Sequence, residues 1–246
     1  MALDPSSALR ALAAHRVFFG HQSVGGNLLD GVRDWLAASG VVWPVVEPSE
    51  APRDGGALIH AAVGHNGQPA TKCADFRRLL DGGTLGRVDV AVLKYCYVDV
   101  QDAADASALV GEYCETLEDL ARRHPTTVVV AVTVPLTHAE GGLGVVAREL
   151  LGRPNPSKLK NLARQAFNDA LRQRWSATPI FDLAAAESTR PDGTSDAFTY
   201  QGRRGQNLVA AYTDDGRHLN AAGRRTVAAA FVQTLAAAVR RAVPGT

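Results

Sequence analysis

The sequence predicts a single domain in which helices cover both faces of a parallel β-sheet of about five strands, a three-layer α/β/α sandwich. Two observations predict this class. The apolar runs of strand length are continuous rather than alternating, which is typical of strands buried on both faces, and they alternate along the chain with amphipathic stretches of helix length. No internal repeat, low-complexity tract or break in composition divides residues 1–246 into further domains.

The elements follow one another in a regular order. Continuous apolar runs predict strands over Arg16 to Gly20, Val41 to Val46, Val88 to Tyr95, Thr126 to Val134 and Pro179 to Leu183. Apolar residues at helical spacing predict helices over Asn27 to Ala38, Cys73 to Leu80, Ala106 to Arg123, Ser157 to Trp175 and Leu219 to Val243. Segments without regular spacing predict loops over Pro48 to Gly67, Pro135 to Pro156 and Ser188 to Asp214.

Charge and cysteine content limit the classes of partner. The chain carries 26 basic and 25 acidic side chains, a balance that argues against a nucleic acid or an anionic membrane as the main partner. Cys73, Cys96 and Cys114 lack CxxC spacing and are expected to be reduced thiols. No stretch approaches the roughly 20 apolar residues that cross a bilayer. We expect a soluble, cytoplasmic protein, and the sequence indicates no oligomeric state.

The strongest chemical signal lies around His218, which follows Asp214 and Asp215 and precedes a long apolar helix. A histidine takes a proton from a nucleophile best when an acceptor holds its other ring nitrogen. Ser23 lies on the turn between the first strand and its helix, where it is either a nucleophile or an ordinary helix N-cap. In parallel sheets ligands bind beyond the carboxyl ends of the strands, the edge where these segments are expected to meet.

In their order these segments resemble the SGNH/GDSL hydrolases, a flavodoxin-like α/β group of esterases, lipases, thioesterases and carbohydrate deacetylases. The resemblance is strongest at Asp215 to His218, followed by Leu219, Asn220 and Gly223. It implies that Asp215 rather than Asp214 orients His218, and that Ser23 is the nucleophile. The implied chemistry is an acyl-enzyme formed by a Ser-His-Asp triad, with no cofactor and no metal.

Two family motifs differ in this chain. His21 and Gln22 replace the glycine and aspartate before the serine, and Cys96 and Val98 replace a glycine and an oxyanion-hole asparagine ahead of Asp99. The resemblance therefore implies another set of oxyanion donors. Gly67 is the candidate for the second-motif glycine, and Asn66 is the candidate for the donor that Val98 cannot supply.

Two further side chains are candidates for the site. Lys94 lies in an apolar strand, and a buried lysine is costly unless it is paired. It is expected to pair with an acidic group such as Asp99, or its ammonium group could meet a substrate carboxylate or a developing oxyanion. Tyr97 is expected to line the pocket. His60, His65 and His138 have no metal-ligand spacing, so no metal site is expected.

The predicted function is a serine hydrolase acting on a small-molecule or carrier-bound ester or thioester. Three alternatives stay open: an acyltransferase on the same triad, another biosynthetic enzyme that uses Lys94 and His21, and a binding protein on a decayed hydrolase fold. Short acyl groups are favoured, because no long apolar lid helix is evident in the loops 135–156 and 188–214.

Overall fold

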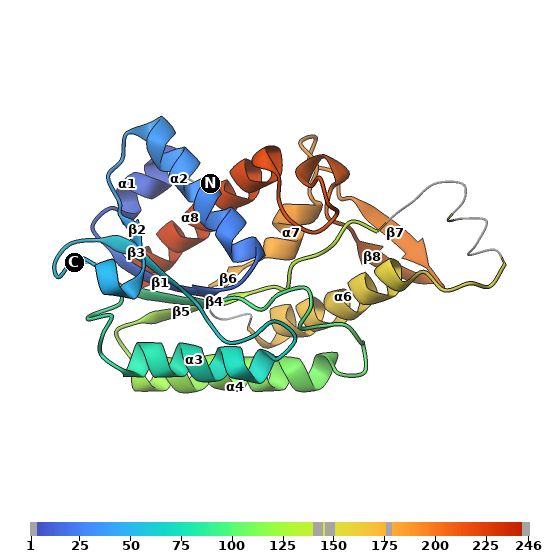
Figure 1. The fold of residues 1–246 in the computed structure, drawn as a ribbon, viewed down its shortest axis with the longest axis horizontal. Helices are drawn as coiled ribbons and strands as arrows, with labels where there is room; N and C mark the ends of the chain where they lie inside the picture. The colour runs from blue at the N-terminus through green and yellow to red at the C-terminus, as the bar shows by residue number, and fades with distance from the viewer. Residues whose placement is uncertain (1–3, 140–144, 146–150, 176–178, 243–246) are drawn as a thin grey trace.

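A parallel β-sheet forms the centre of the molecule (Figure 1). The computed structural model describes residues 4–139, 145, 151–175 and 179–242, and within these residues the sheet has six strands in the order β2-β3-β1-β4-β5-β6. The strands are β1 (Arg16–His21), β2 (Val45–Val46), β3 (Ala57–Ala62), β4 (Val90–Leu93), β5 (Val128–Val132) and β6 (Ile180–Phe181). Without the two-residue edge strand β2, this is the flavodoxin-like order. The predicted fold class is confirmed.

Helices cover both faces of the sheet (Figure 1). One layer contains α1 (Pro5–Leu12), α2 (Val24–Ser39), α7 (Leu183–Ser188) and α8 (Ala221–Ala242). The other contains α3 (Pro69–Asp81), α4 (Ala106–Arg123) and α6 (Pro156–Arg174). Successive strand residues point to opposite faces. Val17 and Phe19 therefore pack in the first layer's core while Phe18 packs in the second.

The sheet has one strand more than predicted, because β3 lies inside the segment Pro48 to Gly67 that was predicted to be a loop. Its apolar centre is only Leu58 and Ile59, and the glycines and polar residues around it hide so short a run. Yet β3 pairs with β1 over six residues and is a neighbour of the central strand. The predicted strand Val41 to Val46 pairs only at its last two residues.

The segment Ser188 to Asp214, predicted to be irregular, contains an antiparallel hairpin of β7 (Ala197–Tyr200) and β8 (Arg203–Gln206). In Figure 1 this hairpin extends beyond the sheet, close to α6. Short 3₁₀ helices cover Pro48–Glu50 and Ala210–Tyr212. Part of the predicted loop Pro135 to Pro156 lies outside the described residues. None of the helices described is both long and apolar enough to cross a membrane.

The contact between α2 and α8 positions the two halves of the candidate site. Ser23 precedes α2 and His218 lies three residues before α8, so the packing of these helices determines how close the two side chains lie. Gly31 permits the contact, because a Cβ atom at this position would clash with the backbone carbonyl of Arg224.

Candidate active site

Ser23, His218 and Asp215 form a continuous hydrogen-bonded chain. Ser23 Oγ lies 2.8 Å from His218 Nε2, and His218 Nδ1 lies 2.7 Å from Asp215 Oδ2. Because an ionised carboxylate only accepts hydrogen bonds, Nδ1 carries the hydrogen and donates to Asp215. In a neutral imidazole this leaves Nε2 to accept the hydroxyl hydrogen of Ser23. The arrangement is that of a nucleophile, a base and a group that orients the base.

Ser23 has an unusual backbone conformation for a residue with a side chain, with φ of 51° and ψ of −111°. A positive φ is sterically unfavourable in any residue other than glycine and often marks a functional turn. Its hydroxyl makes no hydrogen bond to the first turn of α2. Ser23 thus occupies the N-cap position of α2 without capping the helix by its side chain, and the hydroxyl contacts His218 instead.

His21 supports the turn but does not approach Ser23 as a second base. Its ring stacks on Phe19, with 4.9 Å between ring centroids, and its Nε2 lies 3.4 Å from Nδ1 of His60. Burial, followed by the charges of His60 and Lys94, lowers the pKa of His21 to about 3, which keeps the ring neutral. Gly25 leaves space for this ring, because a Cβ there would clash with His21.

Asp215 is held as a carboxylate by its own loop. Its Oδ1 accepts the backbone N–H groups of Arg217 at 2.8 Å and His218 at 2.7 Å. Slight burial opposes ionisation, but these N–H groups and the His218 imidazole keep the pKa of Asp215 well below its usual range. Asp214 instead accepts a hydrogen bond from the side chain of Asn220 at 3.0 Å. The geometry thus pairs His218 with Asp215 and not with Asp214.

Asn27 holds the histidine loop against α2. Its Oδ1 accepts the backbone N–H of Leu219, the residue after His218, at 3.2 Å. Sequence reasoning missed this role, although a polar residue one helical turn after Ser23 in an apolar helix is a usable signal. Tyr97 also contacts the histidine, with its ring edge-on and 6.1 Å between centroids.

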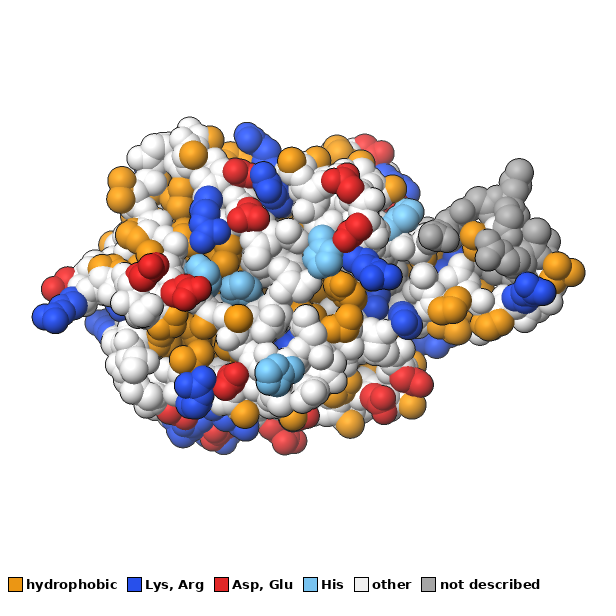
Figure 2. Space-filling view, in the orientation of Figure 1, with side chains coloured by type: hydrophobic (Ala, Val, Ile, Leu, Met, Phe, Trp, Pro, Cys, Tyr) orange, Lys and Arg blue, Asp and Glu red, His pale blue; other side chains and the backbone are white. Residues whose placement is uncertain are grey.

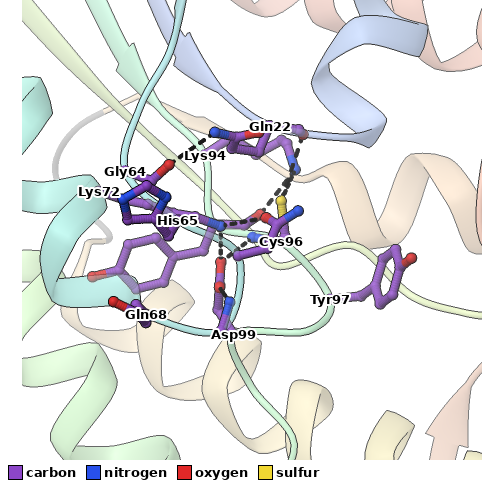
Figure 3. Close-up of polar contacts among 12 residues, drawn as sticks. Gln22, Gly64, His65, Gln68, Lys72, Lys94, Cys96, Tyr97 and Asp99 are labelled. Atoms are coloured by element: carbon purple, nitrogen blue, oxygen red, sulfur yellow. Dashed lines mark hydrogen bonds and ion pairs between the residues drawn. The ribbon is translucent and has the colours of Figure 1, made fainter.

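The carboxylate of Asp99 gathers three donors (Figure 3). It accepts the backbone N–H groups of Gly67 at 2.8 Å and Cys96 at 2.6 Å, and it forms an ion pair with the ammonium group of Lys72. Both side chains of this ion pair are fully buried. The expectation that the Gly67 N–H serves as an oxyanion donor is therefore corrected, since Asp99 already accepts that hydrogen.

Lys94 does not pair with Asp99, contrary to expectation. Its ammonium group donates to the carbonyl of Tyr95 at 3.0 Å and contacts Cys96 Sγ at 3.4 Å (Figure 3). Alternation along β4 explains the difference, because it directs Lys94 to the side of the sheet that packs on α2 and α8. Lys72 comes from α3 on the other side and reaches Asp99. The spacing of Lys72 and Lys94 in the sequence does not indicate which of them pairs with Asp99.

The remaining predicted residues lie at the surface of this region. Asn66 is exposed, and its Oδ1 accepts a hydrogen bond from Lys72 at 3.0 Å, which leaves its amide N–H groups for other partners. The half-buried side chain of Tyr97 points away from the Asp99 cluster (Figure 3). Among the described residues, no three His, Cys, Asp or Glu side chains are placed to hold a metal ion.

A cleft of about 560 Å³ lies beside the triad, and Tyr97 and Asp215 are part of its wall. A larger cavity of about 1090 Å³ lies elsewhere, between β6, α7 and the end of α8, and no triad residue lines it. Of the triad, only Asp215 lines the smaller, more polar cleft, which therefore adjoins the triad without enclosing Ser23 or His218. Figure 2 shows histidine, acidic and basic side chains close together near the middle of one face of the molecule.

Comparison with known proteins places the fold. No family model matches the chain, and no curated protein matches its sequence. A carbohydrate esterase family 3 protein from Talaromyces cellulolyticus has a TM-score of 0.50 and 12% identity, over 92% of this chain and 99% of that one. An acetyl esterase mutant with an acetate ion has a TM-score of 0.52 and 15% identity, over 93% of this chain and 100% of that one. At such identities the likeness concerns the fold alone, and that fold is the α/β/α sandwich with a parallel sheet that the sequence predicts.

Proposed function

We propose that this protein is a serine hydrolase that cleaves short-chain acyl esters through an acyl-enzyme on Ser23. The observation that carries the proposal is the hydrogen-bonded chain from Ser23 through His218 to Asp215. A binding protein on a decayed fold would have no need to keep three residues from the two ends of the chain in this geometry. The strained backbone of Ser23 points the same way.

In the proposed reaction Ser23 Oγ attacks the ester carbonyl while His218 Nε2 takes its proton. The protonated His218 then gives this proton to the leaving alkoxide as the carbon–oxygen bond breaks, which leaves the acyl group on Ser23. A water molecule, deprotonated by His218, attacks the acyl-enzyme, and the proton returns to Ser23 as the acid departs. Asp215 holds the ring and stabilises its positive charge at both stages.

The oxyanion that forms in each step needs donors. The backbone N–H of Ser23 and the side-chain amide of Asn66 are the groups we assign to this role. With Gly67 committed to Asp99 and valine at position 98, this set is small. Removal of one oxyanion donor typically costs about 100- to 1000-fold in rate, so Asn66→Ala is expected to lose activity on that scale.

Hydrolysis is favoured over acyl transfer by the openness of the site. The side chain of His218 is 43% exposed and that of Asp215 is 53% exposed, so water reaches the base directly. An acyltransferase must keep water from its acyl-enzyme. The acetyl esterase with a similar fold supports short acyl groups as the substrate class.

The test is intact-protein mass spectrometry after incubation with a fluorophosphonate, in parallel with hydrolysis of p-nitrophenyl acetate, butyrate and octanoate. Wild type should gain one adduct and hydrolyse acetate best, while Ser23→Ala and His218→Ala should do neither. The exposed serine variant Ser49→Ala is the matched control and should behave as wild type. A folded wild type that gains no adduct and cleaves no ester would refute the proposal.

A further inference from the structure

The smaller cleft adjoins the triad at Asp215 and lies on the side of His218. Asp215 and Tyr97 line it, and both contact the ring of His218. In the proposed mechanism His218 delivers a proton to the leaving oxygen, so the leaving group must lie on the His218 side of the reacting carbon. The cleft is thus placed to receive the alcohol part rather than the acyl group.

Two exposed cations border this cleft and form no ion pair with a described residue. Lys160 comes from the second turn of α6 and Arg217 from the histidine loop. Within the described part of the chain, neither side chain makes a hydrogen bond or an ion pair. Two carboxylates lie in the same wall, but their hydrogen bonds go to other groups: Asp215 holds His218, and Asp214 accepts from the Asn220 amide.

A third cation, Arg164, lies in the wall of the cleft and is only 2% exposed. It donates to three neutral oxygens, namely the Tyr97 carbonyl at 3.0 Å, Thr137 Oγ1 at 2.8 Å and Asn161 Oδ1 at 2.8 Å. No described carboxylate accepts a hydrogen bond from this guanidinium. Burial of a charge is expensive; it lowers the pKa of Arg164 to about 10, and the nearby Glu187 opposes this shift without making a hydrogen bond to the guanidinium.

The polar groups of the cleft converge from separate elements. Ser157, Lys160 and Arg164 share one face of α6, because they are spaced three and four residues apart. His138 lies opposite on the loop after β5, and its Nδ1 donates to the Leu208 carbonyl at 3.0 Å, which leaves Nε2 for a ligand. Figure 2 shows basic side chains next to a histidine near the middle of this face.

From these contacts we infer that the cleft binds an anionic group, a carboxylate or a phosphate, on the alcohol part of the ester. Lys160 and Arg217 contact the anion, and Arg164 contributes its buried positive charge and holds Tyr97 in the wall. The inference rests on the proposed function and narrows its substrate class to short acyl esters of anionic alcohols.

The experiment compares three acetyl esters that differ mainly in charge: 4-acetoxybenzoate, its neutral analogue 4-acetoxybenzamide, and 4-acetoxyphenyl phosphate. Wild type should cleave an anionic ester with a kcat/KM about tenfold or more above that of the amide, chiefly through a lower KM, since a hydrogen bond to a charged group contributes on this scale. The ratio should fall with added salt. The two anionic esters distinguish a carboxylate from a phosphate site.

Charge removal tests the assignment of residues. In Lys160→Gln combined with Arg217→Gln, the preference for the anionic ester should fall about tenfold or more. Lys158→Gln is the matched control, because Lys158 faces the rings of Phe198 and Tyr200 instead of the cleft, and it should keep the wild-type ratio. A wild type that cleaves the neutral and anionic esters equally well would overturn the inference while leaving the proposed function intact.

Binding gives a readout that does not need turnover. Calorimetry on Ser23→Ala should detect tighter binding of 4-hydroxybenzoate or 4-hydroxyphenyl phosphate than of 4-hydroxybenzamide, and the Lys160→Gln and Arg217→Gln changes should abolish the difference. If no ester is cleaved but this difference is present, the proposed function fails and the anion site stands. Equal binding of all three compounds would refute the anion site.

Discussion

At the scale of single residues, the site depends on groups that cannot be exchanged for their chemical relatives. Asp214 and Asp215 are adjacent and identical, yet only Asp215 accepts the His218 ring and two backbone N–H groups. Lys72 and Lys94 are both fully buried, yet only Lys72 has a carboxylate partner. Each pair therefore offers its own internal control for a mutational test.

Asp214 and Asp215 distinguish two effects on His218: a hydrogen bond that orients the ring, and a negative charge that is merely nearby. Asp215→Asn should lower kcat about 10⁴-fold, because an amide no longer holds the imidazole in the productive tautomer. Asp214→Asn should change kcat little, since Asp214 contacts Asn220 and not the ring. The measurement is hydrolysis of p-nitrophenyl acetate by both variants at equal purity. Comparable losses in the two variants would contradict the assignment of Asp215.

The two buried lysines, Lys72 and Lys94, are expected to differ in their contribution to the stability of the fold. Lys72→Met leaves Asp99 as a buried carboxylate without its ammonium partner, which is expected to lower the free energy of unfolding by about 3–5 kcal/mol. Lys94→Met should cost less, because the hydrogen bonds described for Lys94 go to the Tyr95 carbonyl and a thiol, and neither group is left as an unpaired charge. Urea unfolding measures both variants. Adding Asp99→Asn to Lys72→Met should recover part of the loss, and a Lys94 variant that is the less stable of the two would refute this account.

At the scale of elements, the distance between α2 and α8 determines whether Ser23 and His218 meet. The two helices approach closely at Gly31, and Asn27 on α2 holds the backbone after His218. Neither contact touches the reacting atoms. Both contacts act by positioning the first residues of α2 and α8, which lie near opposite ends of the chain.

Gly31→Ala tests this positioning. Alanine favours a helix over glycine by roughly 1 kcal/mol, but here its Cβ would clash with the carbonyl of Arg224, and such overpacking typically costs about 1–3 kcal/mol. We expect net loss of stability and a lower kcat. Gly111→Ala in α4 is the control, because a Cβ there meets nothing within 4 Å, and it should be neutral or stabilising. Thermal unfolding and ester hydrolysis are measured on both; a Gly31→Ala variant as stable and active as wild type would be the contrary result.

The same scale shows what sequence patterns can and cannot predict. The helix Ala106 to Arg123 is observed with its predicted bounds, because its apolar spacing is long and regular. Strand β3 was missed because its apolar run is short and bordered by glycines. The hairpin β7–β8 was missed because its strands alternate weakly and pack on α6 only in the folded chain.

At the scale of the whole molecule, two distant segments meet because parallel strands bring their carboxyl ends to one edge of the sheet. This rule, with the family resemblance, was sufficient to predict that Ser23, Asp215 and His218 lie together. It does not predict which lysine reaches Asp99, or that Gly67 has given its N–H to that carboxylate. Those contacts depend on the face of the sheet from which each side chain comes, and a one-residue shift along a strand reverses that face.

Burial of the Glu187 carboxyl group predicts how the stability of the protein depends on pH. Glu187 is fully buried; its Oε2 accepts the Leu136 N–H at 2.7 Å, and its Oε1 has no hydrogen-bond partner. Burial raises the pKa of Glu187 from 4.5 to about 8, although the Leu136 N–H and the charges of Lys94 and Arg164 oppose this shift. Between these two values the folded protein holds a proton that the unfolded chain releases. Its stability should therefore fall as pH rises from about 4.5 through about 8.

Glu187→Gln isolates this contribution, because glutamine has nearly the shape of the protonated acid but does not titrate. Near pH 5 the variant should be about as stable as wild type. At pH 9 it should be the more stable of the two, by at most about 5 kcal/mol at 1.36 kcal/mol per pKa unit. Other titrating groups act alike in both proteins and cancel in the difference. Urea unfolding at pH 5, 7 and 9 measures it, with the exposed Glu115→Gln as control. A difference that stays constant with pH would show that Glu187 remains charged in the folded protein, balanced by Lys94 and Arg164.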